Sequence, residues 1–335
     1  MNQITIADIA RAAGCSKPVV SKVLHDRGGN TRVSAATRDR VIEVAKELGY
    51  RPNAAARSMA TNRSGHVGVL VPNTPGNPFT HPAGYEIVTG ANTRLHELGM
   101  STILANVDDI RQGIDQLRLF REHLVDGMMV LGNVPLDLVP RIEELVEHCV
   151  WIDTNVWRHT CCLRRDEHFS GLQATQLAIT AGYRKLVLFT YPDNEHYSMH
   201  ERRGGAEQAC ADAGLTLEIL TENQKGELAE RLEPDTCIVA NSIYQAFVAR
   251  QLAESKRLFP GTDFGLTCCD DMRQVNRWWP QLSRVEFPRF EMGRIGADMC
   301  AELIAGTPPR STLLRCGVIE RASCQARTAD HLSHS

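Results

Sequence analysis

Two lysines and a serine near the N-terminus are spaced so that they can meet a polyanion. In the stretch "GCSKPVVSKVLHD", Lys17, Pro18, Ser21 and Lys22 share the helical face opposite the valines and the leucine. Ammonium and hydroxyl groups on such a face can donate hydrogen bonds to phosphates and to base edges in a DNA groove. The pattern favours DNA binding over the alternative, a purely structural three-helix module.

The elements that position these groups read as three short helices. Thr5 followed by Asp8 resembles a capping box, and Gly14 marks the end of the first helix. Ser16 can cap the second helix, and a third is expected from Ser34 to about residue 48. Two short helices joined by a tight glycine turn predict a helix-turn-helix, in which the second helix enters the major groove.

Charge is unevenly distributed along the chain. Residues 1–63 hold 11 Lys and Arg against 5 Asp and Glu, a balance of +6, whereas the other residues hold 26 against 35, a balance of −9. A basic head on an acidic body is typical of a protein whose head meets nucleic acid. Chance asymmetry of the surface is the alternative.

From residue 66 the pattern changes to apolar strands that alternate with helices. The strands include "HVGVLVP", "STILAN", "GMMVLG", "CVWID", "KLVLFTY", "CIVAN" and "FGLTCC". This alternation predicts two successive doubly wound α/β units. Ligands of such sheets bind beyond the carboxyl ends of the strands, where polar residues stand: Asn73, Asp153, Asn241 and Asp270, with Arg202 opening a nearby helix.

The N-terminal segments resemble a known family. The runs "TIADIARAAGCSKPVVSKVLHD" and "VSAATRDRVIEVAKELGYRPNAAARSMAT" are similar to the DNA-binding head and hinge of the lac-repressor/galactose-repressor (LacI/GalR) family over residues 4–62, and the rest of the chain is similar more loosely. The resemblance implies an α/β protein with a three-helix helix-turn-helix head, a hinge helix and a two-lobed, periplasmic-binding-protein-like (type I) doubly wound body. It also implies a homodimeric transcriptional regulator, most simply a repressor, on palindromic double-stranded operator DNA.

The resemblance also implies a set of DNA contacts. Lys17, Pro18 and Lys22 match base-reading positions, although Lys22 stands where the family usually has Arg. Ser16, Ser21 and His25 match backbone contacts, and His25 replaces a common Asn. Met59 aligns with the apolar wedge that the hinge helix inserts into a central base step. The full expected set is Thr5, Ser16, Lys17, Pro18, Ser21, Lys22, His25, Asn53, Ala56 and Met59.

A small-molecule effector is the second implied partner. Family effector contacts carry over onto Phe79, Asp153, Arg202, Asn241 and Asp270, and the loop around Phe79 is longer than usual. Two carboxylates beside one arginine do not favour an anionic ligand. We therefore expect a carbohydrate, with a neutral sugar ahead of a sugar acid or a purine.

The expected domains follow from these readings. Residues 1–50 form the helix-turn-helix head, residues 51–63 the hinge helix and linker, and residues 64–335 the effector-binding and dimerisation body. Within the body, one lobe is expected at 64–157 plus 287–318, and the other at 158–286 plus 319–335. The chain ends in "QARTADHLSHS" without apolar heptads, so a dimer rather than a tetramer is expected.

Other functional classes find less support. Neither a signal peptide nor an 18-residue apolar run is present in the sequence, so we expect a cytoplasmic protein without a membrane partner. Glycine-rich, His-Glu zinc and serine-elbow motifs are missing from it, which argues against an enzyme or a cofactor. The adjacent pair Cys161-Cys162 lacks zinc-ligand spacing, so no metal is expected. A transcriptional activator of the same family and a solute-binding protein without a DNA role are the remaining alternatives.

Overall fold

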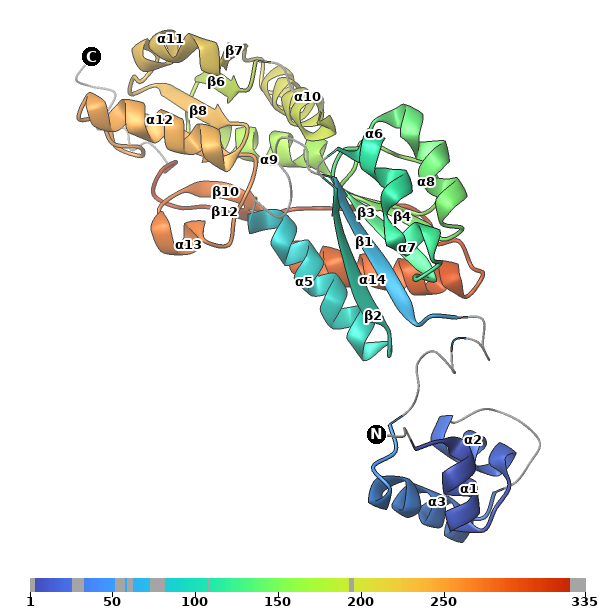
Figure 1. Ribbon diagram of the computed structural model, residues 1–335. Helices are drawn as coiled ribbons and strands as arrows, with labels where there is room; N and C mark the ends of the chain where they lie inside the picture. Colours follow the sequence, from blue (N-terminus) through green and yellow to red (C-terminus); the bar gives the residue numbers. More distant parts are fainter. Residues whose placement is uncertain are drawn as a thin grey trace. The chain divides into compact units, whose positions relative to one another are not determined.

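The computed structural model describes residues 4–25, 33–51, 58, 63–72, 82–107, 109–192 and 196–325, and it divides the chain into two compact units, Met1–Ser64 and Gly65–Ser335. We call the first unit the head and the second the body (Figure 1).

The head is built from three helices around a small apolar core. These are α1 Ile6–Ala13, α2 Lys17–His25 and α3 Ala35–Glu47. The expected capping box forms at Thr5, and Gly14 ends α1 in the left-handed conformation with φ 65°. Small side chains let the three helices approach closely. The buried core consists of Ile9, Ala10, Ala13, Val20, Val23, Val41 and Ala45.

The body contains two six-stranded sheets, each covered by helices on both faces. The first sheet has the order β11-β5-β4-β3-β1-β2 and is parallel throughout. Its strands are β1 His66–Pro72, β2 Ser101–Val107, β3 Gly127–Leu131, β4 Cys149–Ile152, β5 Cys162–Arg165 and β11 Thr312–Leu314. Because both faces are covered, a central strand such as β1 is apolar on both sides.

Two long helices pack on one face of the first sheet and shorter helices cover the other. Figure 1 shows α5 Pro82–Glu97 and α14 Arg289–Ile304 side by side. Gly90 and Gly293 allow this close approach, because a Cβ at either position would lie about 2 Å from a backbone oxygen of the other helix. The short helices on the opposite side are α6 Ile110–Gly113, η1 Ile114–Gln116, α7 Arg118–Arg121, η2 Leu136–Leu138 and α8 Val139–Leu145.

The second sheet has the order β12-β10-β9-β8-β6-β7, and β12 is antiparallel to β10. Its strands are β6 Lys185–Thr190, β7 Leu217–Thr221, β8 Thr236–Ala240, β9 Gly265–Cys268, β10 Ser283–Glu286 and β12 Gly317–Ile319. The helices α9 Glu167–Thr180 and α10 Tyr197–Asp212 pack together on one face. The opposite face carries η3 Glu222–Gln224, α11 Lys225–Glu230, α12 Ile243–Ser255 and α13 Val275–Trp278.

The structure corrects the lobe boundaries expected from the sequence. The boundary at 157/158 is wrong, because β5 pairs with β4 and with β11 inside the first sheet. The boundary at 318/319 is also wrong, because β12 pairs with β10 of the second sheet. The chain therefore crosses between sheets after β5, between β10 and α14, and between β11 and β12. The sequence pattern did not predict β5, because two of its four residues, "CLRR", are arginines.

A second difference concerns residues 111–123, where the sequence pattern between the strands "STILAN" and "GMMVLG" predicts one helix. The structure has three short pieces there, α6, η1 and α7, in place of one continuous helix. Leu117 has extended backbone with ψ 119° and separates η1 from α7. The apolar spacing of this segment is helical, but its backbone takes a turn that the spacing does not reveal.

None of the helices in the described residues combines the length and the apolar character that crossing a membrane requires.

Candidate functional site

The second helix of the head presents its N-terminal residues to solvent. Ser16, Lys17 and Pro18 are exposed, while Ser21 and Lys22 are half-buried further along α2. Val20 and Val23 point the other way, into the head core. The surface of α2 is therefore polar and basic at the end that a helix-turn-helix inserts into the major groove.

Thr5, which is one of the expected DNA contacts, also has a structural role at the start of α1. Its hydroxyl donates to Asp8 Oδ2 at 2.7 Å, and its backbone N–H donates to the same oxygen at 3.0 Å. The Asp8 N–H donates back to Thr5 Oγ1 at 3.4 Å. These bonds hold the pKa of the Asp8 carboxyl below its usual range. Thr5 thus fixes the start of α1, whatever contact it makes with DNA.

Several expected contacts cannot be placed. Asn53, Ala56, Met59 and Phe79 lie outside the described residues. His25 ends α2, and only its backbone is described.

The body brings three of its predicted residues into one buried cluster. Arg202 of α10 donates from Nη1 to the backbone oxygen of Asn241 at 2.6 Å, and its Nη2 lies 3.3 Å from Asp270 Oδ2. Asn241 follows β8 and Asp270 lies just beyond β9, so both stand at the carboxyl edge of the second sheet. All three residues are at most 8 % exposed.

Asp153 joins the same cluster from the first sheet. It follows β4 with φ 54°, in the left-handed region that ordinary residues rarely adopt. Its Oδ1 accepts a bond of 2.5 Å from the Tyr197 hydroxyl, and the Arg165 guanidinium lies 3.2 Å away. The carboxyl edges of the two sheets therefore meet in this cluster.

Three charged residues of the cluster were missed by the sequence analysis. Glu167 is fully buried at the start of α9 and receives Arg202 Nε at 2.7 Å and Nη2 at 2.8 Å. Arg165 of β5 lies 2.8 Å from Glu167 Oε1 and 3.4 Å from Asp270 Oδ1. Arg289, the first residue of α14, pairs with Asp270 Oδ1. For Arg165 and Glu167 the sequence signal was a charged run, "RRDE", directly after the three apolar residues "CCL".

The charges of this cluster balance. Among the described residues it holds the guanidinium groups of Arg165, Arg202 and Arg289 and the carboxylates of Asp153, Glu167 and Asp270. The expectation that the effector site has two carboxylates beside one arginine is therefore wrong. Arg165 of β5 and Arg289 of α14 add two cations that the sequence did not assign to this site.

The arginines decide the protonation of the buried acids. Burial alone would raise the pKa of Asp270, but Arg202, Arg289 and Arg165 outweigh it and hold the pKa below its usual range. Burial likewise opposes ionisation of Asp153, and Arg165 is the strongest of the groups that lower its pKa nonetheless. Both acids are thus carboxylates at neutral pH.

Three amide side chains near the carboxyl ends of the strands have buried polar atoms without a hydrogen-bond partner in the described part of the chain. The side chain of Asn241 is fully buried, and neither its Oδ1 nor its Nδ2 has a partner within the described part of the chain. The same holds there for Asn133 Oδ1, after β3, and for Gln274 Oε1, before α13. Buried polar atoms are normally satisfied, so atoms of this kind mark places where a ligand or water can bind.

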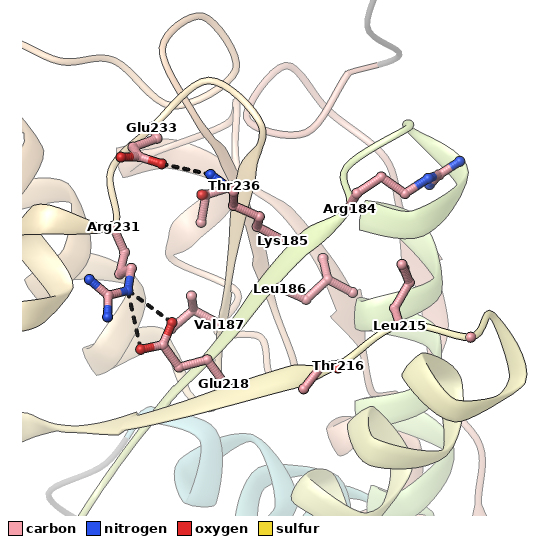
Figure 2. Close-up of a pocket in the computed structure, with 11 residues that line it drawn as sticks. Arg184, Lys185, Leu186, Val187, Leu215, Thr216, Glu218, Arg231, Glu233 and Thr236 are labelled. Carbon is pink, nitrogen blue, oxygen red and sulfur yellow. Dashed lines mark hydrogen bonds and ion pairs between the residues drawn. The ribbon is translucent and has the colours of Figure 1, made fainter.

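A hollow of about 660 Å³ lies elsewhere, at the amino ends of strands in the second sheet. Figure 2 shows that its charged groups pair with each other, Lys185 with Glu233 and Arg231 with Glu218. These side chains are largely solvated, with the Lys185 side chain 58 % exposed. The hollow shares no residue with the buried cluster, and we do not assign the effector to it.

Burial raises the pKa of several cysteine thiols. Burial raises the pKa of Cys269 to about 12, so this thiol is inert as a nucleophile. Within the described ranges, no group of three or more His, Cys, Asp and Glu side chains is placed to hold a metal ion.

Two family models match the chain. Residues 5–53 match the lacI family of bacterial regulatory proteins, and residues 175–324 match the periplasmic binding protein-like domain. The first match covers the three helices of the head, and the second covers all six strands of the second sheet together with α14.

Curated relatives extend over nearly the whole chain. The HTH-type transcriptional regulator RegA of Clostridium saccharobutylicum is 31% identical over 317 residues, which cover 90% of this chain and 92% of the relative. The ribose operon repressor of Bacillus subtilis is 26% identical, covering 94% of this chain and 96% of its own.

Solved structures share the fold. The lac repressor dimer bound to operator and the anti-inducer ONPF matches with a TM-score of 0.77 at 19% identity, covering 97% of this chain and all of that one. The complex of transcriptional regulator CelR with cellobiose matches with a TM-score of 0.66 at 24% identity, covering 96% of this chain and all of that one. With a helix-turn-helix head, two doubly wound lobes and a relative above 30% identity along its length, the chain belongs to the lacI family of bacterial regulatory proteins.

Proposed function

We propose that this protein is an operator-binding repressor whose affinity for DNA is controlled by a neutral sugar bound between the two lobes of its body. The observation that carries the DNA-binding half is the exposed polar N-terminal end of α2 on an apolar three-helix core. Lys17, Pro18 and Lys22 read bases, and Ser16, Ser21 and His25 hold the phosphate backbone. Residues 51–63 link this head to the body, with Met59 as the wedge at the centre of the operator.

The acting form is a homodimer on a palindromic operator. One head offers a single recognition helix, and two such helices reach half-sites about one helical turn apart. Large aromatic side chains on the body support self-association, because Tyr85 of α5 is 63% exposed and Trp278 of α13 is 57% exposed. Exposed aromatic rings are enriched in protein interfaces.

The effector half rests on the buried cluster and on the free amide of Asn241. With three cations matched by three carboxylates, an added ionic group would upset the balance, whereas a neutral ligand would not. Hydroxyl groups both donate and accept, and so they suit an amide that offers one donor nitrogen and one acceptor oxygen. The names of two relatives, the ribose operon repressor and the CelR–cellobiose complex, refer to sugars. We place the ligand against Asn241, Asp153, Arg202 and Asp270.

A DNA mobility-shift experiment tests this function directly. The full-length protein is incubated with DNA fragments from upstream of its own gene, and bound palindromes are mapped by footprinting. Bound fragments are then titrated with ribose, sucrose, cellobiose and matched sugar acids. Tight sequence-specific binding that one neutral sugar changes is the expected result. Tight binding to a single half-site by a monomer would contradict the dimer, and a response only to sugar acids would contradict the ligand class.

A further inference from the structure

The two lobes of the body are tied together by their own charged side chains. Arg165 lies on β5 of the first sheet, and Arg289 begins α14, which packs against α5 and the first sheet. Both guanidinium groups reach Asp270, which follows β9 of the second sheet. The carboxylate oxygen Oδ1 is shared by the two first-lobe arginines, while Oδ2 faces Arg202 of the second lobe.

Both first-lobe arginines also share one aromatic neighbour. The guanidinium carbons of Arg165 and Arg289 lie 5.3 Å and 5.9 Å from the centroid of the Phe287 ring. Phe287 is buried in the segment that leads from β10 back to α14. The ring therefore supports both cations at the point where the chain crosses between the lobes.

A second tie lies at the start of α10. The Tyr197 hydroxyl, from the second lobe, donates to Asp153 Oδ1 of the first lobe at 2.5 Å. The guanidinium of Arg164, on β5, lies 4.2 Å from the centroid of the same Tyr197 ring, and its Nε donates to the Thr154 backbone oxygen at 2.7 Å. Arg164 thus joins the strand of one lobe to a helix of the other.

We propose that Arg165, Arg289 and Tyr197 form an inter-lobe lock that restrains the separation of the two lobes and thereby sets the operator affinity of the protein. The lock is an internal feature of the body, and only its effect on DNA rests on the proposed function. Ion pairs at a lobe boundary are suited to this task, because separating the lobes breaks the pairing of Asp270 with Arg165 and Arg289. Relative motion of two domains is otherwise the default expectation unless their interface is large and hydrophobic.

The two arginines of the lock can be replaced without leaving a buried carboxylate unpaired. If Arg165 is replaced, Glu167 keeps the two-bond pairing with Arg202, and Asp153 keeps the Tyr197 hydroxyl. If both Arg165 and Arg289 are replaced, Asp270 retains Arg202 and the backbone N–H of Asp271 at 2.8 Å. In Arg165→Met and Arg289→Met, made singly or together, every carboxylate of the cluster thus keeps at least one hydrogen-bond donor.

The test is hydrogen–deuterium exchange of the full-length protein without DNA, read by mass spectrometry. In the double variant, amides of residues 153–157 and 197–203 should exchange about tenfold faster, since couplings between sites change equilibria by roughly 5- to 150-fold. Arg294→Met is the matched control: Arg294 is also on α14, but its ion pair with Glu97 joins two helices of the same lobe. Unchanged exchange in a folded double variant would overturn the lock.

A more conservative substitution tests the lock if the double variant does not fold. Tyr197→Phe keeps the ring beside Arg164 and removes only the hydroxyl that reaches Asp153. Its exchange should rise by a smaller factor, about threefold, over residues 153–157. No rise would count against the lock.

Operator binding by the same variants separates the two proposals. Faster exchange with an altered operator affinity supports both the lock and its link to DNA. Faster exchange with unchanged operator affinity keeps the lock and rejects its effect on the head. If the wild-type protein does not bind DNA specifically, the proposed function is rejected. The exchange result would still show whether the lock holds the two lobes together.

Discussion

The head and the body hold the side chains of their proposed sites in opposite ways. In the head, Lys17 and Pro18 are exposed on one helix, and each depends only on the orientation of that helix. In the body, Arg202 and Asp270 are buried, paired with each other and linked to partners on three other elements, β5, α9 and α14. A substitution in the head should therefore act on one contact, whereas a substitution in the body should act on a whole network. The predictions below probe that contrast, from the largest expected effect to the smallest.

Asp270→Asn should have the largest effect. It removes one charge from a balanced cluster and leaves three buried guanidinium groups facing two carboxylates. Removing one partner of a buried ion pair costs about 3–5 kcal/mol of unfolding free energy. Urea denaturation followed by circular dichroism measures the change.

The matched control for Asp270 is Asp298→Asn. Asp298 also pairs with an arginine, Arg94 at 2.8 Å, but its side chain is 42% exposed. Its loss should cost less than about 1 kcal/mol, because solvent screens the pair. Equal costs for the two variants would show that the body network is no more cooperative than a surface pair.

Lys17→Ala and Lys22→Ala should have an intermediate effect on DNA binding alone. Each should weaken operator binding by roughly 1–3 kcal/mol and relax the base preference at one position per half-site, while leaving the stability of the body unchanged. Titrations against operators with single base changes measure both quantities. Lys46→Ala, at the exposed end of α3, is the control and should keep the wild-type base preference.

Thr5→Ala should have a smaller effect, centred on α1. Loss of an N-cap costs about 1 kcal/mol, or roughly fivefold in local opening, so amides of residues 6–13 should exchange correspondingly faster. Thr5→Ser keeps the hydroxyl that bonds Asp8 and should behave like the wild type. If both variants lose operator affinity without faster exchange, Thr5 acts through DNA contact and not through its cap.

His196 should give the smallest effect, as a weak pH dependence of stability. Burial lowers its pKa below 6.5, while Asp153 and Glu167 raise it and Arg165 and Arg202 lower it further. The folded state therefore binds a proton less readily than the unfolded state, and stability should fall as the pH drops below about 6.5. We expect a loss of about 1 kcal/mol or less between about pH 7.5 and 5.5.

The variant His196→Asn isolates this contribution. Neutral His196 accepts the Ser198 N–H at the start of α10, and an asparagine can cap a helix without titrating. The variant should lose less stability than the wild type over the same pH range. The inter-lobe lock should be insensitive there, because Asp153 and Asp270 have lowered pKa values and stay ionised until well below about pH 4.

Local patterns in the sequence determined the head almost completely. The capping box at Thr5, the stop at Gly14 and the polar face of α2 involve neighbours within four residues, so propensity and periodicity suffice to predict them. The same is true of the long apolar strands β1, β6 and β8, which are buried on both faces and read as continuous apolar runs. The polar residues that follow such strands were predicted for the same reason.

Only the tertiary structure decided which charges meet in the body. Arg165 and Arg289 are 124 positions apart, and both reach Asp270 because β5 and α14 lie in the first lobe while β9 lies in the second. No spacing rule links these residues, and "CLRR" has too few apolar positions to indicate a strand. The short strand forms because β4 and β11 pair with it on either side. Long-range pairing thus overrides local preference and converts scattered charges into one balanced cluster.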